Sequence, residues 1–184
     1  MKKPNILFIQ GGGEGAYKED RKLFLYLEGH LKGLYQLHYP AMPQERHPNY
    51  EIYKAKIDAV LKKIDTRVVL AGHSLGSCFL LKYLSEERIN RDIAGIFLIA
   101  TPFWGGRGWQ YEGFRLKNDF AASIAPGVPL FFYHSTDDKV VPFSHLALYQ
   151  KEVPHATFRI IDGRGHQLND DLSEVVEDIR SLTR

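Results

Sequence analysis

The sequence predicts an α/β fold, namely a doubly wound, mainly parallel, six-stranded sheet of order 2-1-3-4-5-6 with helices on both faces. Two observations support this prediction. Short apolar runs alternate along the chain with longer amphipathic stretches, as in sheets that are built by right-handed crossovers. The runs are also apolar almost throughout, as expected for strands that are buried on both faces of a parallel sheet.

Six segments have the composition of strands, because most are rich in β-branched or aromatic residues. They span residues 5–10, 35–39, 67–71, 93–100, 130–134 and 157–161. Apolar residues at three- and four-residue spacing mark helices between them. One stripe comprises Leu23, Leu27, Leu31 and Leu34, and another comprises Ile57, Val60, Leu61 and Ile64. Further helices are expected over 74–84, 143–151 and 173–182, the last with an inner side of Leu172, Val175, Val176 and Ile179.

Length and composition exclude several classes of protein. A chain of 184 residues favours one domain, residues 1–184. Its 24 Lys and Arg against 22 Asp and Glu form no basic block, so neither nucleic acid nor a membrane is an expected partner. The early apolar run is too short for a signal peptide or a membrane span, so we expect a cytoplasmic location. One cysteine, Cys78, and no Cys/His cluster argue against a disulfide or a metal.

The chain contains a nucleophile-elbow motif directly after the third predicted strand. Gly72-His73-Ser74-Leu75-Gly76 matches Gly-x-Ser-x-Gly, in which a sharp strand-to-helix turn exposes a serine hydroxyl. A glycine-flanked turn capped by serine is the simpler alternative. The buried-strand run before the motif and the helical run after it favour the elbow, so Ser74 is the expected nucleophile.

A serine nucleophile needs a base, and the base needs an orienting carboxylate. His166 is the expected base because it follows the last predicted strand in a Gly-x-Gly-His loop. Asp137 and Asp138 follow the fifth strand. We favour Asp138 as the partner of His166, and the other aspartate is expected to cap the next turn. The chain order Ser, Asp, His is that of α/β-hydrolase triads.

Backbone amides are expected to stabilise the oxyanion. Leu75, which follows the nucleophile, supplies one, and Gly12 is the candidate for the other because the first and third strands are neighbours in the predicted order. The same glycine-rich turn also fits the dinucleotide fingerprint Gly-x-Gly-x-x-Ala. That fingerprint requires an acidic residue at the end of the second strand, and none occurs before Glu45, which argues against a nucleotide.

These motifs resemble those of α/β-hydrolase-fold proteins, and more closely those of the compact serine hydrolase family that includes retinoblastoma-binding protein nine and the bacterial YdeN type. The similarity covers essentially the whole chain and is carried by residues 11–15, 42–43, 72–76, 135–142 and 163–166. In the family pattern the acid stands three residues before Val141, which is Asp138. The resemblance implies a small carboxylesterase-like enzyme with no metal or organic cofactor.

One family feature is missing from this sequence. The Leu-x-Cys-x-Glu segment associated with retinoblastoma binding is absent around Cys78. Retinoblastoma binding is therefore not expected of this chain.

An aromatic-rich segment, at about 101–120, separates the fourth and fifth predicted strands. Because it follows the carboxyl end of a strand, it is expected to form a short lid and an apolar wall over Ser74. Phe103, Trp104 and Trp109 are the candidate substrate-binding residues. The alternative is that these rings only pack the segment onto the core.

The leading hypothesis is a cofactor-free serine hydrolase that cleaves a small acyl ester through an acyl-enzyme. A non-catalytic binding or regulatory protein on the same fold is the alternative from another class. Peptidase, thioesterase, lactonase or lyase chemistry with the same triad is a third hypothesis. The joint presence of nucleophile, base, acid and glycine turn favours the enzyme, while the acyl chain and the oligomeric state stay open.

Overall fold

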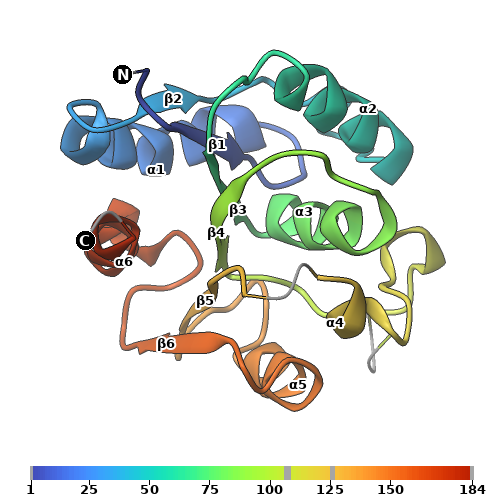
Figure 1. The fold of residues 1–184 in the computed structure, drawn as a ribbon. Helices are drawn as coiled ribbons and strands as arrows, with labels where there is room; N and C mark the ends of the chain where they lie inside the picture. Colours follow the sequence, from blue (N-terminus) through green and yellow to red (C-terminus); the bar gives the residue numbers. More distant parts are fainter. Residues whose placement is uncertain (1, 106–108, 125–126, 183–184) are drawn as a thin grey trace.

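The computed structural model describes residues 2–105, 109–124 and 127–182. Six parallel strands form one sheet of order β2-β1-β3-β4-β5-β6, which confirms the predicted topology (Figure 1). The strands are β1 (Asn5–Ile9), β2 (Gln36–His38), β3 (Val68–His73), β4 (Ile93–Ile99), β5 (Leu130–Ser135) and β6 (Thr157–Ile161).

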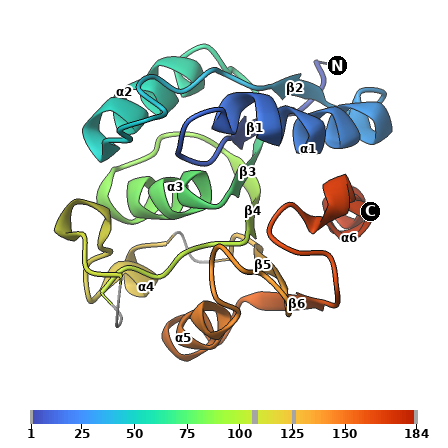
Figure 2. The same ribbon diagram turned by 180° about the vertical axis from the view of Figure 1, so that it is seen from behind.

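Helices cover both faces of the sheet. One face is covered by α1 (Ala16–Leu31) and α6 (Ser173–Ser181), and the other by α2 (Tyr50–Leu61), α3 (Leu75–Glu86) and α5 (Ser144–Glu152) (Figures 1 and 2). Three short elements complete the structure: α4 (Phe120–Ser123) and the 3-10 turns η1 (Glu112–Phe114) and η2 (Leu168–Asp170). No helix in these described ranges is both long and apolar enough to cross a membrane.

The strands are apolar throughout because each supplies two separate cores. Successive side chains of a strand point to opposite faces of a sheet. In β1, Ile6 and Phe8 pack beneath α1 and α6, whereas Leu7 and Ile9 pack beneath α2 and α3. All four side chains are fully buried. This two-sided burial is the physical reason for the continuous apolar runs that predicted the sheet.

Most elements begin or end one or two residues from the expected boundary, and two of these differences affect packing or the site. Leu34 is not part of the first apolar stripe: α1 ends at Leu31, the chain turns there, and Tyr35 is buried in place of Leu34, which is 48% exposed. β3 continues two residues past the predicted end at 71, to His73. The second difference matters for the site, because it places Ser74 at the junction between β3 and α3.

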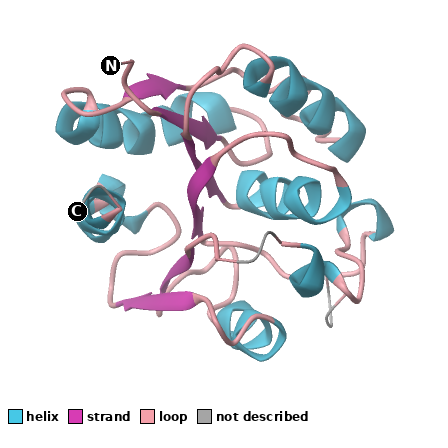
Figure 3. Cartoon of the chain, in the orientation of Figure 1, coloured by secondary structure: helices cyan, strands magenta, loops and turns pink. Residues whose placement is uncertain are grey.

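The connection between β4 and β5 departs from regular alternation. Among its described residues, most lie in loops, and the helical ones form the short elements η1 and α4 (Figure 3). This connection contains the predicted lid-like segment, of which residues 106–108 lie outside the described residues.

Candidate active site

Ser74 occupies a strained turn between β3 and α3. Its backbone has φ 52° and ψ −126°, a region that non-glycine residues rarely adopt and that costs about 1–3 kcal/mol. The amide of Ser74 donates a hydrogen bond of 2.8 Å to the carbonyl of Ile99 at the end of β4. This is the geometry of a nucleophile elbow, in which the neighbouring strand holds the turn.

The two glycines of the motif allow the elbow to pack closely. A Cβ atom at Gly76 would lie 2.1 Å from the carbonyl oxygen of Gln10, and one at Gly72 would lie 2.9 Å from the amide nitrogen of Ser77. Both separations are shorter than real Cβ contacts. The start of α3 therefore approaches the end of β1 at a distance that no larger residue permits.

His166 and Asp138 meet at the same edge of the sheet. His166 Nδ1 lies 2.8 Å from Asp138 Oδ2, and the Asp138 carboxylate is fully buried. The other oxygen, Oδ1, accepts the amides of Val140 and Val141 at 2.8 and 2.9 Å. Burial alone would raise the pKa of Asp138, but hydrogen bonds from His134 and His166 outweigh burial and hold this pKa well below its usual range.

The environment of His166 favours a neutral imidazole. Burial lowers the pKa of His166 below its ordinary value, and the hydrogen bond to Asp138 only partly opposes this shift. A neutral histidine whose Nδ1 is held by a carboxylate presents Nε2 as the proton acceptor. His166 is thus electrostatically suited to act as a general base near neutral pH.

Asp137 has a different role from the one expected. The sequence assigned one aspartate to His166 and the other to the next turn, but Asp138 does both. The Asp137 carboxylate instead accepts hydrogen bonds from the Ser135 hydroxyl at 2.6 Å and from the Gly165 amide at 2.8 Å. Asp137 therefore braces the loop that carries His166.

Ser74 and His166 are neighbours through His73. The His166 ring lies 4.7 Å, centroid to centroid, from the ring of His73, the residue before Ser74. Among the described residues no hydrogen bond joins Ser74 to His166. Such hydrogen bonds often form only when substrate binds.

The two candidate oxyanion residues also lie together. Gly12 packs so closely on Leu75 that a Cβ atom at Gly12 would lie 2.5 Å from Leu75 Cδ2. The amides of Gly11 and Gly13 donate to the Asp20 carboxylate and the Glu45 carbonyl. Within the described ranges the amide of Gly12 has no such acceptor. As the first residue of α3, Leu75 also has an amide without an intrahelical partner.

A carboxylate occupies the place where the dinucleotide fingerprint would hold a phosphate. The fingerprint binds phosphate at the N-terminus of the first helix. Here the Glu45 side chain accepts hydrogen bonds of 3.0 Å from the amides of Gly15 and Tyr17 at the start of α1. This negative charge gives a structural reason, beyond the missing acidic residue, why the glycine-rich turn does not suit a nucleotide.

Sequence reasoning missed a second polar cluster beside the elbow. The Asp20 carboxylate lies within hydrogen-bond distance of His73 and accepts a hydrogen bond from the Gln167 side chain. Asp20 and His73 are almost fully buried. One signal was available: Asp20 precedes Leu23 by three residues, so it is a carboxylate on the apolar stripe of α1.

The aromatic residues of the 101–120 segment pack on one another and on the helices. The Trp104 ring contacts those of Trp109 and Phe114 at 4.8 and 4.9 Å. Phe103 contacts the Tyr149 ring of α5 at 5.0 Å. Phe103 and Trp104 also line a cavity of about 180 Å³, which Trp109 does not line. Contact of these three residues with substrate stays a prediction.

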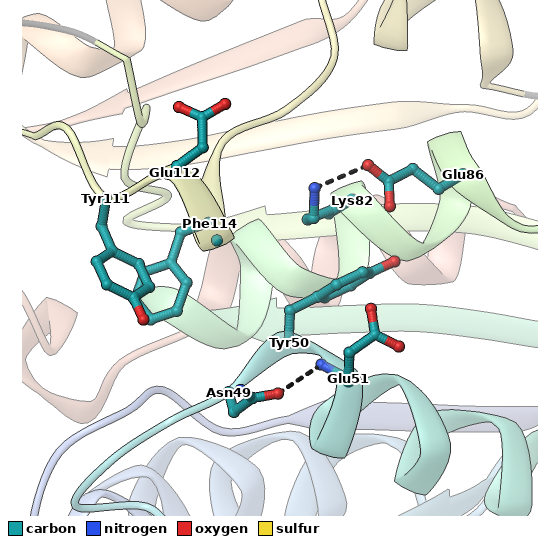
Figure 4. A pocket seen from close by; sticks show the side chains of 9 residues that line it. Asn49, Tyr50, Glu51, Lys82, Glu86, Tyr111, Glu112 and Phe114 are labelled. Atoms are coloured by element: carbon teal, nitrogen blue, oxygen red, sulfur yellow. Dashed lines mark hydrogen bonds and ion pairs between the residues drawn. The ribbon is translucent and has the colours of Figure 1, made fainter.

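A larger cavity, of about 280 Å³, lies between α2, α3 and η1 (Figure 4). Figure 4 shows the ion pair of Lys82 and Glu86 above the ring of Tyr50, with Phe114 across the opening. Neither Ser74 nor either of its candidate partners lines this cavity. Its position along α3 separates it from the candidate active site.

The fold and the elbow define the class of protein. The structure resembles the ydeN gene product of B. subtilis, with a TM-score of 0.77, 19% identity, and coverage of 97% of this chain and 98% of that chain. It also resembles Est1E from Butyrivibrio proteoclasticus, with a TM-score of 0.72, 18% identity, and coverage of 100% and 88%. These likenesses show an α/β-hydrolase fold.

The family follows from the sequence itself. A family model described as serine hydrolase matches residues 30–175, so the chain belongs to the serine hydrolase family. The matched range includes Ser74, Asp138 and His166. Comparison with curated protein sequences gives no significant match.

Proposed function

We propose that this serine hydrolase cleaves a small carboxylic ester, with Ser74 as nucleophile, His166 as general base and Asp138 as the orienting acid. One observation carries the proposal: His166 Nδ1 is hydrogen-bonded to the buried Asp138 carboxylate beside a strained serine elbow. A buried histidine–carboxylate pair beside a serine on a strand-to-helix turn is the arrangement that activates the serine hydroxyl.

In the acylation step, Ser74 Oγ attacks the ester carbonyl carbon while its proton passes to His166 Nε2. The carbonyl electron pair moves to oxygen, and this oxyanion accepts hydrogen bonds from the amides of Gly12 and Leu75. The bond from carbon to the alcohol oxygen then breaks. His166 returns the proton to that oxygen, and the acyl group remains on Ser74.

Deacylation repeats these steps with water. His166 takes a proton from water, the hydroxide oxygen bonds to the acyl carbon, and the same two amides hold the oxyanion. The bond to Ser74 Oγ breaks, the carboxylic acid leaves, and His166 returns the proton to the serine.

Three further features belong to this proposal. The 101–120 segment acts as a short lid and apolar wall, because it follows the carboxyl end of β4, where the Ile99 carbonyl accepts the Ser74 amide. Cleavage of an ester is in keeping with the similar structure of an esterase from Exiguobacterium antarcticum. That protein is 15% identical, with a TM-score of 0.69 over 100% of this chain and 94% of that chain. A cytoplasmic location is consistent with the one described cysteine, which is free and buried.

The test is intact-mass spectrometry after incubation with a fluorophosphonate. We expect one adduct on the wild type and none on Ser74→Ala, because only an activated serine reacts rapidly. Turnover of a p-nitrophenyl ester should fall roughly a million-fold in the same variant. Ser85→Ala is the matched control, since Ser85 lies at the other end of α3 and its hydroxyl donates to the Lys82 carbonyl.

The opposite results would exclude the proposed function. A folded wild-type protein that forms no adduct would favour the binding-protein hypothesis. Retention of the adduct by Ser74→Ala would move the nucleophile to another residue. Reaction with thioesters or peptides in preference to oxygen esters would keep the triad and replace the substrate class.

A further inference from the structure

A buried carboxylate connects three parts of the site. Asp20, on α1, is 1% exposed. Its Oδ2 accepts the amide of Gly11 at 2.7 Å, and its Oδ1 accepts the Gln167 side-chain amide at 3.0 Å. Both oxygens lie 3.0 Å from His73 Nδ1. Asp20 therefore contacts the glycine-rich turn, the elbow and the loop of His166 at once.

Both ring nitrogens of His73 face an acceptor, which favours the imidazolium form. Nδ1 faces the Asp20 carboxylate, and Nε2 lies 3.0 Å from the backbone carbonyl oxygen of His166. A carbonyl can only accept, so Nε2 carries a proton, and the carboxylate favours a proton on Nδ1 as well. Burial by itself would lower the pKa of His73, but the interactions with Asp20 outweigh burial and raise it.

Asp20 and His73 contact two backbone segments, the glycine-rich turn and the loop of His166, whose relative position matters for acyl transfer. Gly11 precedes the candidate oxyanion residue Gly12, and the carbonyl held by His73 belongs to His166 itself. An oxyanion donor and a base must be fixed within fractions of an ångström of their working positions, and a displacement of about 1 Å can cost about 100-fold in rate.

We propose that Asp20 and His73 form a positioning pair that fixes the oxyanion turn relative to the loop of the catalytic base. This inference rests on the proposed function, because it assigns the pair a role toward Ser74 chemistry. Both residues are only 1% exposed, so substrate in the site would not reach them. His73 has no ring nitrogen left to exchange a proton, and Asp20 is covered by its three partners.

The pair also contributes charge beside His166. The charged and titratable groups that face His166 are Asp138 from the loop after β5, His73 from β3 and Asp20 from α1. His134 reaches this set only through Asp138. The positive charge of His73 lowers the pKa of His166 more than the negative charge of Asp20 raises it. Removing both charges should therefore raise the pKa of His166.

The decisive variant is Asp20→Asn, compared with Asp178→Asn. Asp178 is a matched control, because it is 8% exposed and accepts hydrogen bonds from Tyr133 and Arg159. It lies on α6, away from the elbow. The measurements are kcat and KM for a short p-nitrophenyl ester, the rate of fluorophosphonate labelling, and the pH dependence of kcat/KM, with circular dichroism and thermal unfolding as measures of folding.

We expect Asp20→Asn to lower kcat and the labelling rate by about 10- to 100-fold with little change in KM. Without the Asp20 carboxylate the buried His73 loses its proton, so both charges disappear and the pKa of His166 rises. The acidic limb of kcat/KM should therefore move to higher pH, because His166 must be neutral to act. Asp178→Asn should lower the unfolding temperature and leave kcat and the limb unchanged. If Asp20→Asn lowers only the unfolding temperature, the pair is merely structural and the inference is overturned.

A milder variant covers the case in which Asp20→Asn does not fold. Gln167→Met removes one hydrogen bond to Asp20 and keeps the length of the side chain. We expect a fall of kcat of about threefold to tenfold, and an unchanged kcat would overturn the inference. The proposed function fails separately: it is lost if Ser74→Ala still forms the fluorophosphonate adduct, whereas the inference alone is lost if Ser74 is labelled and Asp20→Asn reacts at the wild-type rate.

Discussion

Two histidine–carboxylate pairs lie side by side at this edge of the sheet, and they are built for opposite tasks. His166 lies 2.8 Å from Asp138, and His73 lies 3.0 Å from Asp20. The rings of the two histidines are 4.7 Å apart. Yet the pKa of His166 is lowered, chiefly by burial, whereas the pKa of His73 is raised because its interactions with Asp20 outweigh burial.

The second ring nitrogen accounts for the difference. His73 uses both nitrogens in hydrogen bonds, one to Asp20 and one to a carbonyl. Across the described residues, His166 uses only Nδ1. A histidine with two permanent acceptors holds its protons, whereas one with a free nitrogen can exchange a proton with a substrate. A histidine paired with a carboxylate is therefore not necessarily a general base, because its other ring nitrogen must also be free to exchange a proton.

The largest expected effect separates the two histidines by activity. His166→Gln should reduce kcat for a p-nitrophenyl ester by roughly a million-fold, because loss of the base disables the whole triad. The variant should still fold, since the His166 side chain is partly exposed and is held by one hydrogen bond. Steady-state kinetics beside circular dichroism measure both quantities. A loss of less than about tenfold would remove His166 from the role of base.

The two neighbouring aspartates give the next contrast. Asp138→Asn should lower kcat by about 10⁴-fold, because an amide cannot hold the required tautomer of the base. Asp137→Asn should cost far less, since the Asp137 carboxylate accepts hydrogen bonds from the Ser135 hydroxyl and the Gly165 amide rather than from the His166 ring. The two variants carry the same chemical change at adjacent positions, so each is the control for the other. The reverse ranking of their kcat values would exchange the two roles.

Local pattern predicted the parts of this site that depend on backbone geometry. The elbow was visible because Gly72 and Gly76 permit contacts that no side chain allows. The parallel sheet was visible because the strands are apolar on both faces. These features depend on residues that are adjacent in sequence, so spacing alone reveals them. The topology then brings the ends of β1, β3, β5 and β6 to one edge.

The second pair was not visible because its contacts join distant segments. Asp20 and His73 are 53 residues apart, and Gln167 is 147 residues from Asp20. No local pattern distinguishes a buried ion-paired histidine from one that packs against a turn. The roles of Asp137 and Asp138 were divided wrongly for the same reason, since one carboxylate can serve a turn with one oxygen and a distant ring with the other.

The two pairs should also differ in how they couple stability to pH. The folded-state pKa of His73 is raised above its unfolded value of 6.5, so its contribution is fully present below that pH and is lost as pH rises through the folded pKa. Each pKa unit between the folded and unfolded states corresponds to about 1.4 kcal/mol in the free energy of unfolding. Urea unfolding from pH 6 to 9 should show this loss in the wild type and a flatter profile in Asp20→Asn. Parallel profiles would mean that His73 is neutral in the folded protein.

The smallest expected effect concerns the peptide between Gly11 and Gly12. The Tyr53 hydroxyl donates a hydrogen bond of 3.1 Å to the Gly11 carbonyl. Because a peptide bond is planar and trans, holding that carbonyl also fixes the direction of the Gly12 amide. Tyr53→Phe keeps the buried ring and removes the hydroxyl, at a cost of about 1 kcal/mol or roughly fivefold in kcat.

Tyr35→Phe is the matched control for Tyr53→Phe. Tyr35 is also buried, and its hydroxyl donates to a backbone carbonyl, that of Ile179, at 3.4 Å on the opposite face of the sheet. Both variants lose one hydroxyl, but the Tyr53 hydroxyl holds the peptide that carries the proposed oxyanion donor, and the Tyr35 hydroxyl does not. Equal kcat values for the two would show that Asp20 alone suffices to orient the turn, and would confine the positioning role to the Asp20 and His73 pair.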